Sequence, residues 1–141
     1  MEALSPAYVT ALASQIGFLS AFLGGFAATF VVTILQVDRP GRVAGWAMGL
    51  AAVAATAFVV AAVTSTALVA GSHPDAPATV ALSDGLVRAR IVSSLCFTLG
   101  AYLLLGAIGC SGWLRSRALG WTTSVAGGLA GLLVTMSILG F

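Results

Sequence analysis

Apolar residues fill four long stretches of this 141-residue chain, and short polar segments separate them. The stretches cover approximately residues 7–37, 43–71, 91–110 and 120–141. None contains Asp, Glu, Lys or Arg, and each reaches the roughly 20 residues that an α-helix needs to cross a bilayer core about 30 Å thick. The pattern predicts an integral membrane protein with four transmembrane helices.

Capping residues refine the ends of these helices. Ser5 and Pro6 are typical of an N-cap followed by proline at the first helical position. Ser83 or Asp84 supplies a cap for the third helix, which therefore begins before its apolar stretch. We expect helices at approximately residues 6–37, 43–71, 84–111 and 118–141. The predicted fold class is an all-α four-helix bundle, in one membrane domain over residues 1–141.

Composition argues against a water-soluble domain. Hydrophobic residues make up 60% of the chain and charged residues 7%, with a mean hydropathy of +1.09. Soluble domains carry about a quarter charged residues. The longest polar segments, residues 72–90 and 111–117, are too short to bury a core of their own.

Arginine positions indicate the orientation in the membrane. Arg39 and Arg42 lie in the first connection, and Arg115 and Arg117 lie in the third, which is on the same side after four crossings. The positive-inside tendency makes that side cytoplasmic, so both termini and the second connection face outward. The chain has six Arg but no Lys or Asn, a bias typical of GC-rich coding, which favours the cytoplasmic (inner) membrane of a bacterium. The expected interface anchors are Arg39, Arg42, Trp46, Arg115, Arg117 and Trp121.

A constant offset of 75 residues aligns the two halves of the chain. The segment 42–46, Arg-Val-Ala-Gly-Trp, then matches the segment 117–121, Arg-Ala-Leu-Gly-Trp, each at the start of the second helix of its half. A true duplication would make each half an α-hairpin of the same topology, related by an axis along the membrane normal. Convergent anchoring is the alternative, because arginine, tryptophan and glycine suit many membrane boundaries.

Small residues recur four positions apart and predict closely packed helix neighbours. Such spacing lets two backbones approach, and in lipid this contact takes over from the hydrophobic drive of soluble bundles. The neighbours can belong to the same chain, to identical copies or to another protein. The residues concerned are Gly17, Ala21, Gly24, Gly25, Gly41, Gly45, Gly49, Gly127 and Gly131.

Phenylalanines form a ladder along the first helix, at Phe18, Phe22, Phe26 and Phe30. The ladder drifts by about 40° per step, because a helix has 3.6 residues per turn. Apolar constrictions close some pores by dewetting, so the ladder is a candidate gate. The simpler interpretation is a stripe that faces lipid or a packing partner.

Three polar side chains lie near the expected outer ends of the helices. Arg88 and Arg90 fall in the first turns of the third helix. Around a ring of subunits they would attract anions at an outer mouth, whereas in a lone chain they would pair with lipid phosphate. Gln15 needs hydrogen-bond partners, and we expect these in lipid headgroups or in Arg90.

The residue types that carry chemistry are scarce. No Asp or Glu lies within the apolar stretches, which argues against a proton-driven exporter. His73 is the only histidine, and Cys96 and Cys110 lie about 21 Å apart on one helix at 1.5 Å per residue, without a C-x-x-C pair. We therefore expect a non-enzymatic protein with no catalytic residues, no cofactor and no metal site.

Two functions remain compatible with the sequence. The favoured one is an accessory or structural subunit that packs against a larger membrane complex, because a pore normally shows a polar lining. The alternative is a homo-oligomeric channel or weakly selective pore with the first helix near its axis. The expected partners are the lipid bilayer and either other membrane subunits or identical copies, and no nucleic acid.

Overall fold

The computed structural model describes residues 6–36, 41–73 and 84–139. These ranges form four long helices and one short 3-10 helix, which are α1 (Pro6–Leu35), α2 (Arg42–Gly71), α4 (Asp84–Ser111), η1 (Gly112–Leu114) and α5 (Arg117–Leu139). Each long helix is long and apolar enough to cross a membrane. The all-α four-helix membrane fold is confirmed.

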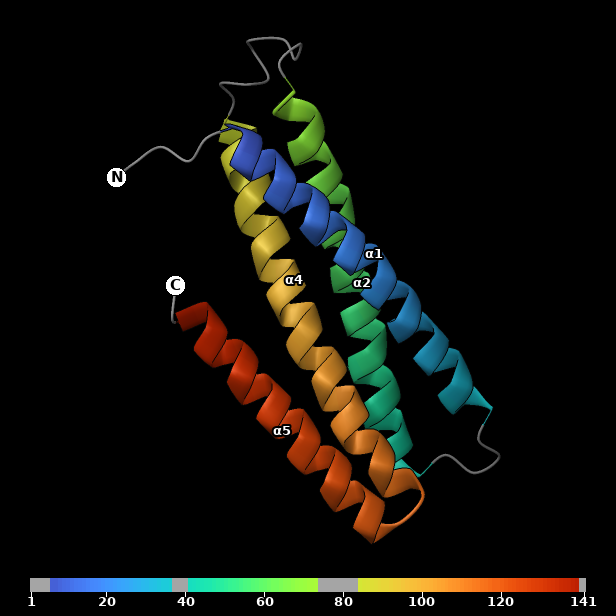
Figure 1. Cartoon of the computed structure of the whole chain (residues 1–141). Coiled ribbons are helices and arrows are strands. Elements are labelled where there is room, and N and C mark those ends of the chain that lie inside the picture. The colour runs from blue at the N-terminus through green and yellow to red at the C-terminus, as the bar shows by residue number, and fades with distance from the viewer. Residues whose placement is uncertain (1–5, 37–40, 74–83, 140–141) are drawn as a thin grey trace.

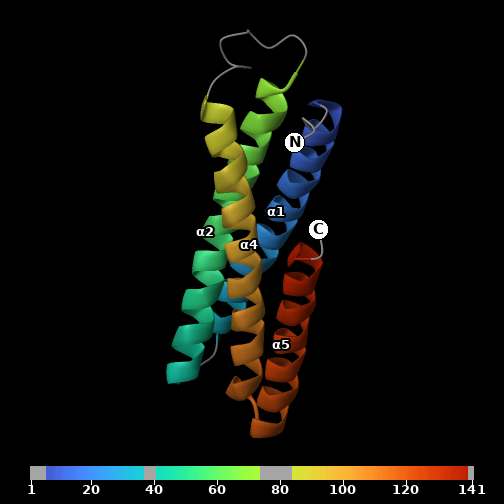
Figure 2. The same ribbon diagram turned by 90° about the vertical axis from the view of Figure 1, so that its left-hand side faces the viewer.

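The helices run alternately up and down, and α1 crosses the others obliquely (Figures 1 and 2). α2 packs against both α1 and α4 through one face, whereas α1 and α4 make few contacts with each other. α5 packs mainly against α4 and η1, and it ends part-way along α4 (Figure 1). The bundle is thus an open row of helices, with α1 and α5 as its outer members.

The inner face of α2 holds the row together through small side chains. Most of its buried residues follow a seven-residue repeat, the period at which two helices stay in contact along a left-handed crossing. Alanine at most of these positions lets the neighbouring backbones come close, which favours association in lipid. The repeat consists of Ala44, Ala47, Ala51, Ala54, Phe58, Ala61, Ser65 and Leu68.

One large side chain interrupts this alanine seam. Phe58 is fully buried, and a glycine faces it from each neighbouring helix. A Cβ at Gly24 of α1 would lie 3.2 Å from the Phe58 Cβ, and a Cβ at Gly100 of α4 would lie 3.0–3.1 Å from the Phe58 ring. The ring also meets Phe97 edge to face, with ring centroids 6.1 Å apart. Phe58 is therefore a knob in a hole made by two glycines.

α1 and α4 contact α2 at matching heights. A Cβ at Gly17 of α1 would lie 3.3 Å from the Ser65 Cβ, and Ser93 of α4 hydrogen-bonds Ser65 with an oxygen–oxygen distance of 2.7 Å. Phe58 lies two turns from Ser65 on α2, and it likewise contacts α1 at Gly24 and α4 at Gly100. In both cases the α1 and α4 residues are 76 positions apart. Because α1 and α4 run in the same direction, residues 76 apart lie at about the same depth.

The two halves of the chain start their second helices at equivalent residues but pack them differently. α2 begins at Arg42 and α5 at Arg117, as the 75-residue offset predicts. A Cβ at Gly45 would meet nothing within 4 Å, whereas a Cβ at Gly120 would meet the ring of Trp113. The duplication stays a prediction, and its halves do not share one packing.

Candidate functional site

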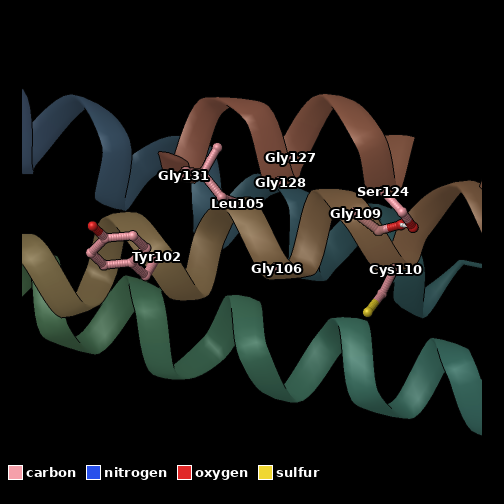
Figure 3. A pocket seen from close by; sticks show the side chains of 9 residues that line it. All are labelled: Tyr102, Leu105, Gly106, Gly109, Cys110, Ser124, Gly127, Gly128 and Gly131. Atoms are coloured by element: carbon pink, nitrogen blue, oxygen red, sulfur yellow. Dashed lines mark hydrogen bonds between the residues drawn. The ribbon is translucent and has the colours of Figure 1, made fainter. Parts of the chain in front are cut away.

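A groove lined by glycine runs between α4 and α5 (Figure 3). Its volume is about 370 Å³, and glycine backbone from both helices forms much of its wall. A Cβ at Gly127 would lie 3.1 Å from the Leu105 carbonyl oxygen, so the two backbones approach closely at its centre. The lining residues are Tyr102, Leu105, Gly106, Gly109, Cys110, Ser124, Gly127, Gly128 and Gly131.

Hydrogen bonds between α4 and α5 close both ends of this glycine groove. At one end the hydroxyl oxygens of Tyr102 and Thr135 lie 2.5 Å apart. Thr135 donates its proton to the Gly131 carbonyl, so Tyr102 is the donor of this bond. At the other end Thr123 and Ser124 both donate to the Gly109 carbonyl, at 3.1 and 3.2 Å.

A tryptophan corner fixes the start of α5. Trp113 of η1 lies over Gly120 and donates its indole N–H to the Ser124 hydroxyl at 3.0 Å. The Trp113 and Trp121 rings have centroids 6.2 Å apart and are inclined by 49°. A Cβ at Gly112 would lie 2.5 Å from the Leu119 carbonyl oxygen, so this corner accepts only glycine there without rearrangement.

The chemistry available in the glycine groove is that of hydroxyls and backbone carbonyls. Its threonine and serine hydroxyls donate to carbonyl groups, which leaves none of them paired with a general base. Within the described part of the chain no three His, Cys, Asp or Glu side chains come together. The arrangement suits packing against an apolar group better than it suits bond making or ion binding.

No family model matches this chain, and neither a curated protein nor a solved structure is significantly similar to it.

The predicted packing glycines divide into two groups. Gly17 and Gly24 face α2, and Gly127 and Gly131 face α4. The others lie on exposed surface within this chain, and added Cβ atoms at the glycines among them would meet nothing within 4 Å. These are Ala21, Gly25, Gly41, Gly45 and Gly49.

The phenylalanine ladder also divides. Phe18, Phe22 and Phe26 point outward with 74%, 67% and 49% of their surface exposed. Phe30 packs against the buried cluster that includes Ile34 and Ala44. The ladder therefore cannot act as one continuous four-residue lining, and only its first three members are available to lipid or a partner.

The predicted boundary residues lie at opposite ends of the row. Trp46 and Trp121 are 72% and 65% exposed near the starts of α2 and α5, and Arg42, Arg115 and Arg117 are exposed at the same end. Arg39 lies outside the described residues. Arg88 and Arg90 are exposed near the start of α4.

The expected pairing of Gln15 with Arg90 is not found. Gln15 is exposed on α1 beside Ser14 and Phe18, while Arg90 lines a different hollow with Tyr8 and Ser94. Arg90 of α4 and the Gln15 side chain thus lie next to different sides of α1. The Ser65–Ser93 hydrogen bond was not predicted from the sequence, because hydroxyls in helices ordinarily bond their own backbone.

Proposed function

We propose that this chain is a non-enzymatic subunit that packs laterally against other subunits of a larger membrane complex. The observation that carries the proposal is the filled interior of the row. Alanine side chains and Phe58 fill much of the space between α1, α2 and α4, and the buried serines Ser20, Ser65 and Ser93 do not form a continuous polar path through the described residues. We therefore assign the function of the chain to its outer surfaces, where other subunits can bind.

The outer face of α2 supports this role. Gly41, Gly45 and Gly49 are exposed one turn apart, with open space in front of each. Lipid tails gain little from glycine, whereas a second helix gains close backbone contact there. This glycine face of α2 is the surface we assign to a foreign subunit.

The proposal includes a location. Arg42, Arg115 and Arg117 at one end of the row support a cytoplasmic assignment of that end by the positive-inside tendency. Both termini would then lie outside the cytoplasmic membrane of a bacterium.

Leucine substitution on the glycine face of α2 tests the proposal. Gly45→Leu and Gly49→Leu introduce side chains into open space, so the chain itself should fold as before. We expect at least a tenfold loss of co-purifying subunits after mild solubilisation of the native membrane. Ala126→Leu on α5 is the control, because Ala126 is exposed and lies outside both the glycine face of α2 and the glycine groove between α4 and α5. Unchanged co-purification in both Gly45 and Gly49 variants would contradict the assignment.

A pore built from several copies is the second candidate, and the outward exposure of Phe18, Phe22 and Phe26 favours it. In such a ring α1 would lie near the axis and its phenylalanines would form the apolar gate. Liposomes that contain only the purified chain discriminate the two functions. Ion leak well above that of protein-free liposomes supports the pore, and equal leak supports the packing subunit.

A further inference from the structure

We infer that a hollow between the starts of α1 and α4 binds a phosphate group through Arg90, and we assign that phosphate to the headgroup of a membrane lipid. The inference goes beyond the proposed function, because it involves neither the glycine face of α2 nor any protein partner. It holds on whichever side of the membrane this end of the bundle lies.

Three helices form the wall of this hollow, which we call the Arg90 hollow. The starts of α1 and α4 lie at the same end of the bundle as the end of α2 (Figures 1 and 2). α1 and α4 make few direct contacts, and the hollow remains between them. Its lining includes Tyr8, Val9 and Leu12 of α1, Leu68 of α2, and Arg90 and Ser94 of α4.

The polar side chains that α4 contributes to the Arg90 hollow suit an anion. The guanidinium of Arg90 offers five N–H donors in a planar fork, a geometry that matches pairs of phosphate oxygens. Ser94 follows one turn later on the same face of α4 and adds a hydroxyl donor. Within the described residues neither side chain makes a hydrogen bond, and Arg90 has no carboxylate partner. The donors are therefore available to a ligand.

The Arg90 hollow lies at the depth of lipid headgroups. Tyr8 is the third residue of α1, and tyrosine is enriched where membrane helices enter the headgroup region. Arg90 is the seventh residue of α4. Helical side chains lean toward the N-terminus of their helix, and long arginine side chains reach for the interface, so the guanidinium extends toward that boundary.

The size and the apolar wall of the Arg90 hollow fit one part of a lipid. Its volume is about 30 Å³, more than the roughly 10–15 Å³ that a water-sized group needs and far less than the 370 Å³ of the glycine groove. A phosphate oxygen fits inside, whereas an acyl chain does not. Val9 and Leu12 provide apolar surface beside the guanidinium for the carbon chains that follow the headgroup.

A bound lipid would join two helices that hardly touch each other. Charge-assisted hydrogen bonds from Arg90 to the phosphate hold the lipid on α4, and contacts with Tyr8 and Val9 hold it on α1. A ligand that binds only the folded chain stabilises it by mass action. Phosphate-bearing lipid should therefore stabilise the bundle through this end of α1.

Two neighbouring arginines provide a matched test. Native mass spectrometry of the purified chain in detergent, with phosphatidylglycerol as the probe, measures how much lipid the chain retains. Arg90→Gln removes the cation from the hollow, and we expect it to lower retention at least fivefold. Arg88→Gln is the control, because Arg88 is also exposed but lies about 200° away around α4 and outside the lining. It should lower retention less than twofold, and equal losses in the two variants would overturn the inference.

Two further probes separate lipid phosphate from its alternatives. Diacylglycerol has the same glycerol and acyl chains without the phosphate, and the unaltered chain should retain it at least fivefold less than phosphatidylglycerol. Equal retention would overturn the assignment to phosphate. Excess inorganic phosphate should leave phosphatidylglycerol bound, because it lacks the apolar contacts. Displacement of the lipid by inorganic phosphate would overturn the assignment to a lipid headgroup.

A stability measurement checks the link between α1 and α4. Phosphatidylglycerol in mixed micelles should raise the SDS fraction at which the unaltered chain and Arg88→Gln unfold, and this rise should be at least halved in Arg90→Gln. An equal response of the three chains, including no response, would contradict the link. None of these results depends on Gly45 or Gly49, so they test the lipid site separately from the packing of foreign subunits.

Discussion

The Phe58 knob concentrates packing energy at one residue. Most contacts between α2 and its neighbours involve alanine, which offers few atoms, whereas this ring touches α1 and α4 together. In lipid the transfer of apolar surface out of water contributes little, so van der Waals contact and close fit dominate. Removing the Phe58 side chain would therefore remove van der Waals contacts with α1 and with α4 at the centre of the bundle.

At this scale we expect Phe58→Ala to lower the free energy of unfolding by about 3 kcal/mol, near the lower end of the range for buried phenylalanine. Phe18→Ala removes the same atoms from an exposed position and should change it by less than about 0.5 kcal/mol. Unfolding of the purified chain in mixed micelles of increasing SDS fraction measures both. Similar losses for the two variants would argue against the knob.

Individual residues also show how far the sequence could lead. The number of helices and their approximate spans followed from the lengths of the apolar stretches, because each span needs about 20 apolar residues. The sequence did not indicate which of the small residues contact a neighbouring helix. Glycines four residues apart permit a close approach, but they do not identify the helix that approaches. Gly24 meets Phe58, while the adjacent Gly25 faces open space.

At the scale of elements, α5 is the least secured helix of the row. Its attachment includes the tryptophan corner, the close approach at Gly127, and hydrogen bonds from Tyr102 to Thr135 and from Thr123 and Ser124 to the Gly109 carbonyl. Hydrogen bonds between membrane helices contribute about 0.6 kcal/mol on average. The corner and the glycine backbone contact must therefore supply most of the stability of the α4–α5 pair.

Valine substitution at two glycines that are 75 positions apart tests whether the tryptophan corner stabilises the start of α5. The alternative is that the Arg-x-x-Gly-Trp segment serves only to anchor the helix at the membrane boundary. Gly120→Val drives a side chain into the Trp113 ring, where a Cβ would already lie 2.5–2.7 Å from ring atoms. We expect a loss of about 1–3 kcal/mol in the same micelle titration, as for other overpacked sites. Gly45→Val, 75 positions earlier, points into open space and should change stability by less than about 0.5 kcal/mol. Equal losses of stability in the Gly120→Val and Gly45→Val variants would mean that the starts of α5 and α2 are packed in the same way.

The repeat of alanines on α2 was visible in the sequence and was not recognised. Positions 44, 47, 51, 54 and 61 alternate by three, four and seven residues, which is the spacing of a helix–helix seam. The glycines of the same helix were predicted to pack, although Gly45 and Gly49 lie on its opposite, exposed face. The groove between α4 and α5 could not be foreseen, because it depends on where two helices diverge.

The whole molecule has one end with more arginine, called the basic end, and an opposite end, called the outer end because we propose that it faces outward. Arg42, Arg115 and Arg117 lie at the first, and Arg88 and Arg90 lie near the second. The transfer of arginine-bearing connections across a membrane is unfavourable, which is the basis of the orientation that we propose.

Thiol labelling of intact cells tests that orientation. In a cysteine-free background, Gly85→Cys lies at the outer end and Ala118→Cys at the basic end, and both positions are exposed. A membrane-impermeant maleimide should label Gly85→Cys before lysis and Ala118→Cys only after it. The reverse pattern would place the termini in the cytoplasm.

The row of helices also has a meaning for biosynthesis. Its extensive contacts join α1 to α2, α2 to α4 and α4 to α5, so every helix packs on the one that was translated just before it. Contacts between sequence neighbours form quickly, because they need little loop closure. Each span that leaves the translocon therefore meets a finished docking surface, and no earlier helix has to wait unpartnered for a distant one.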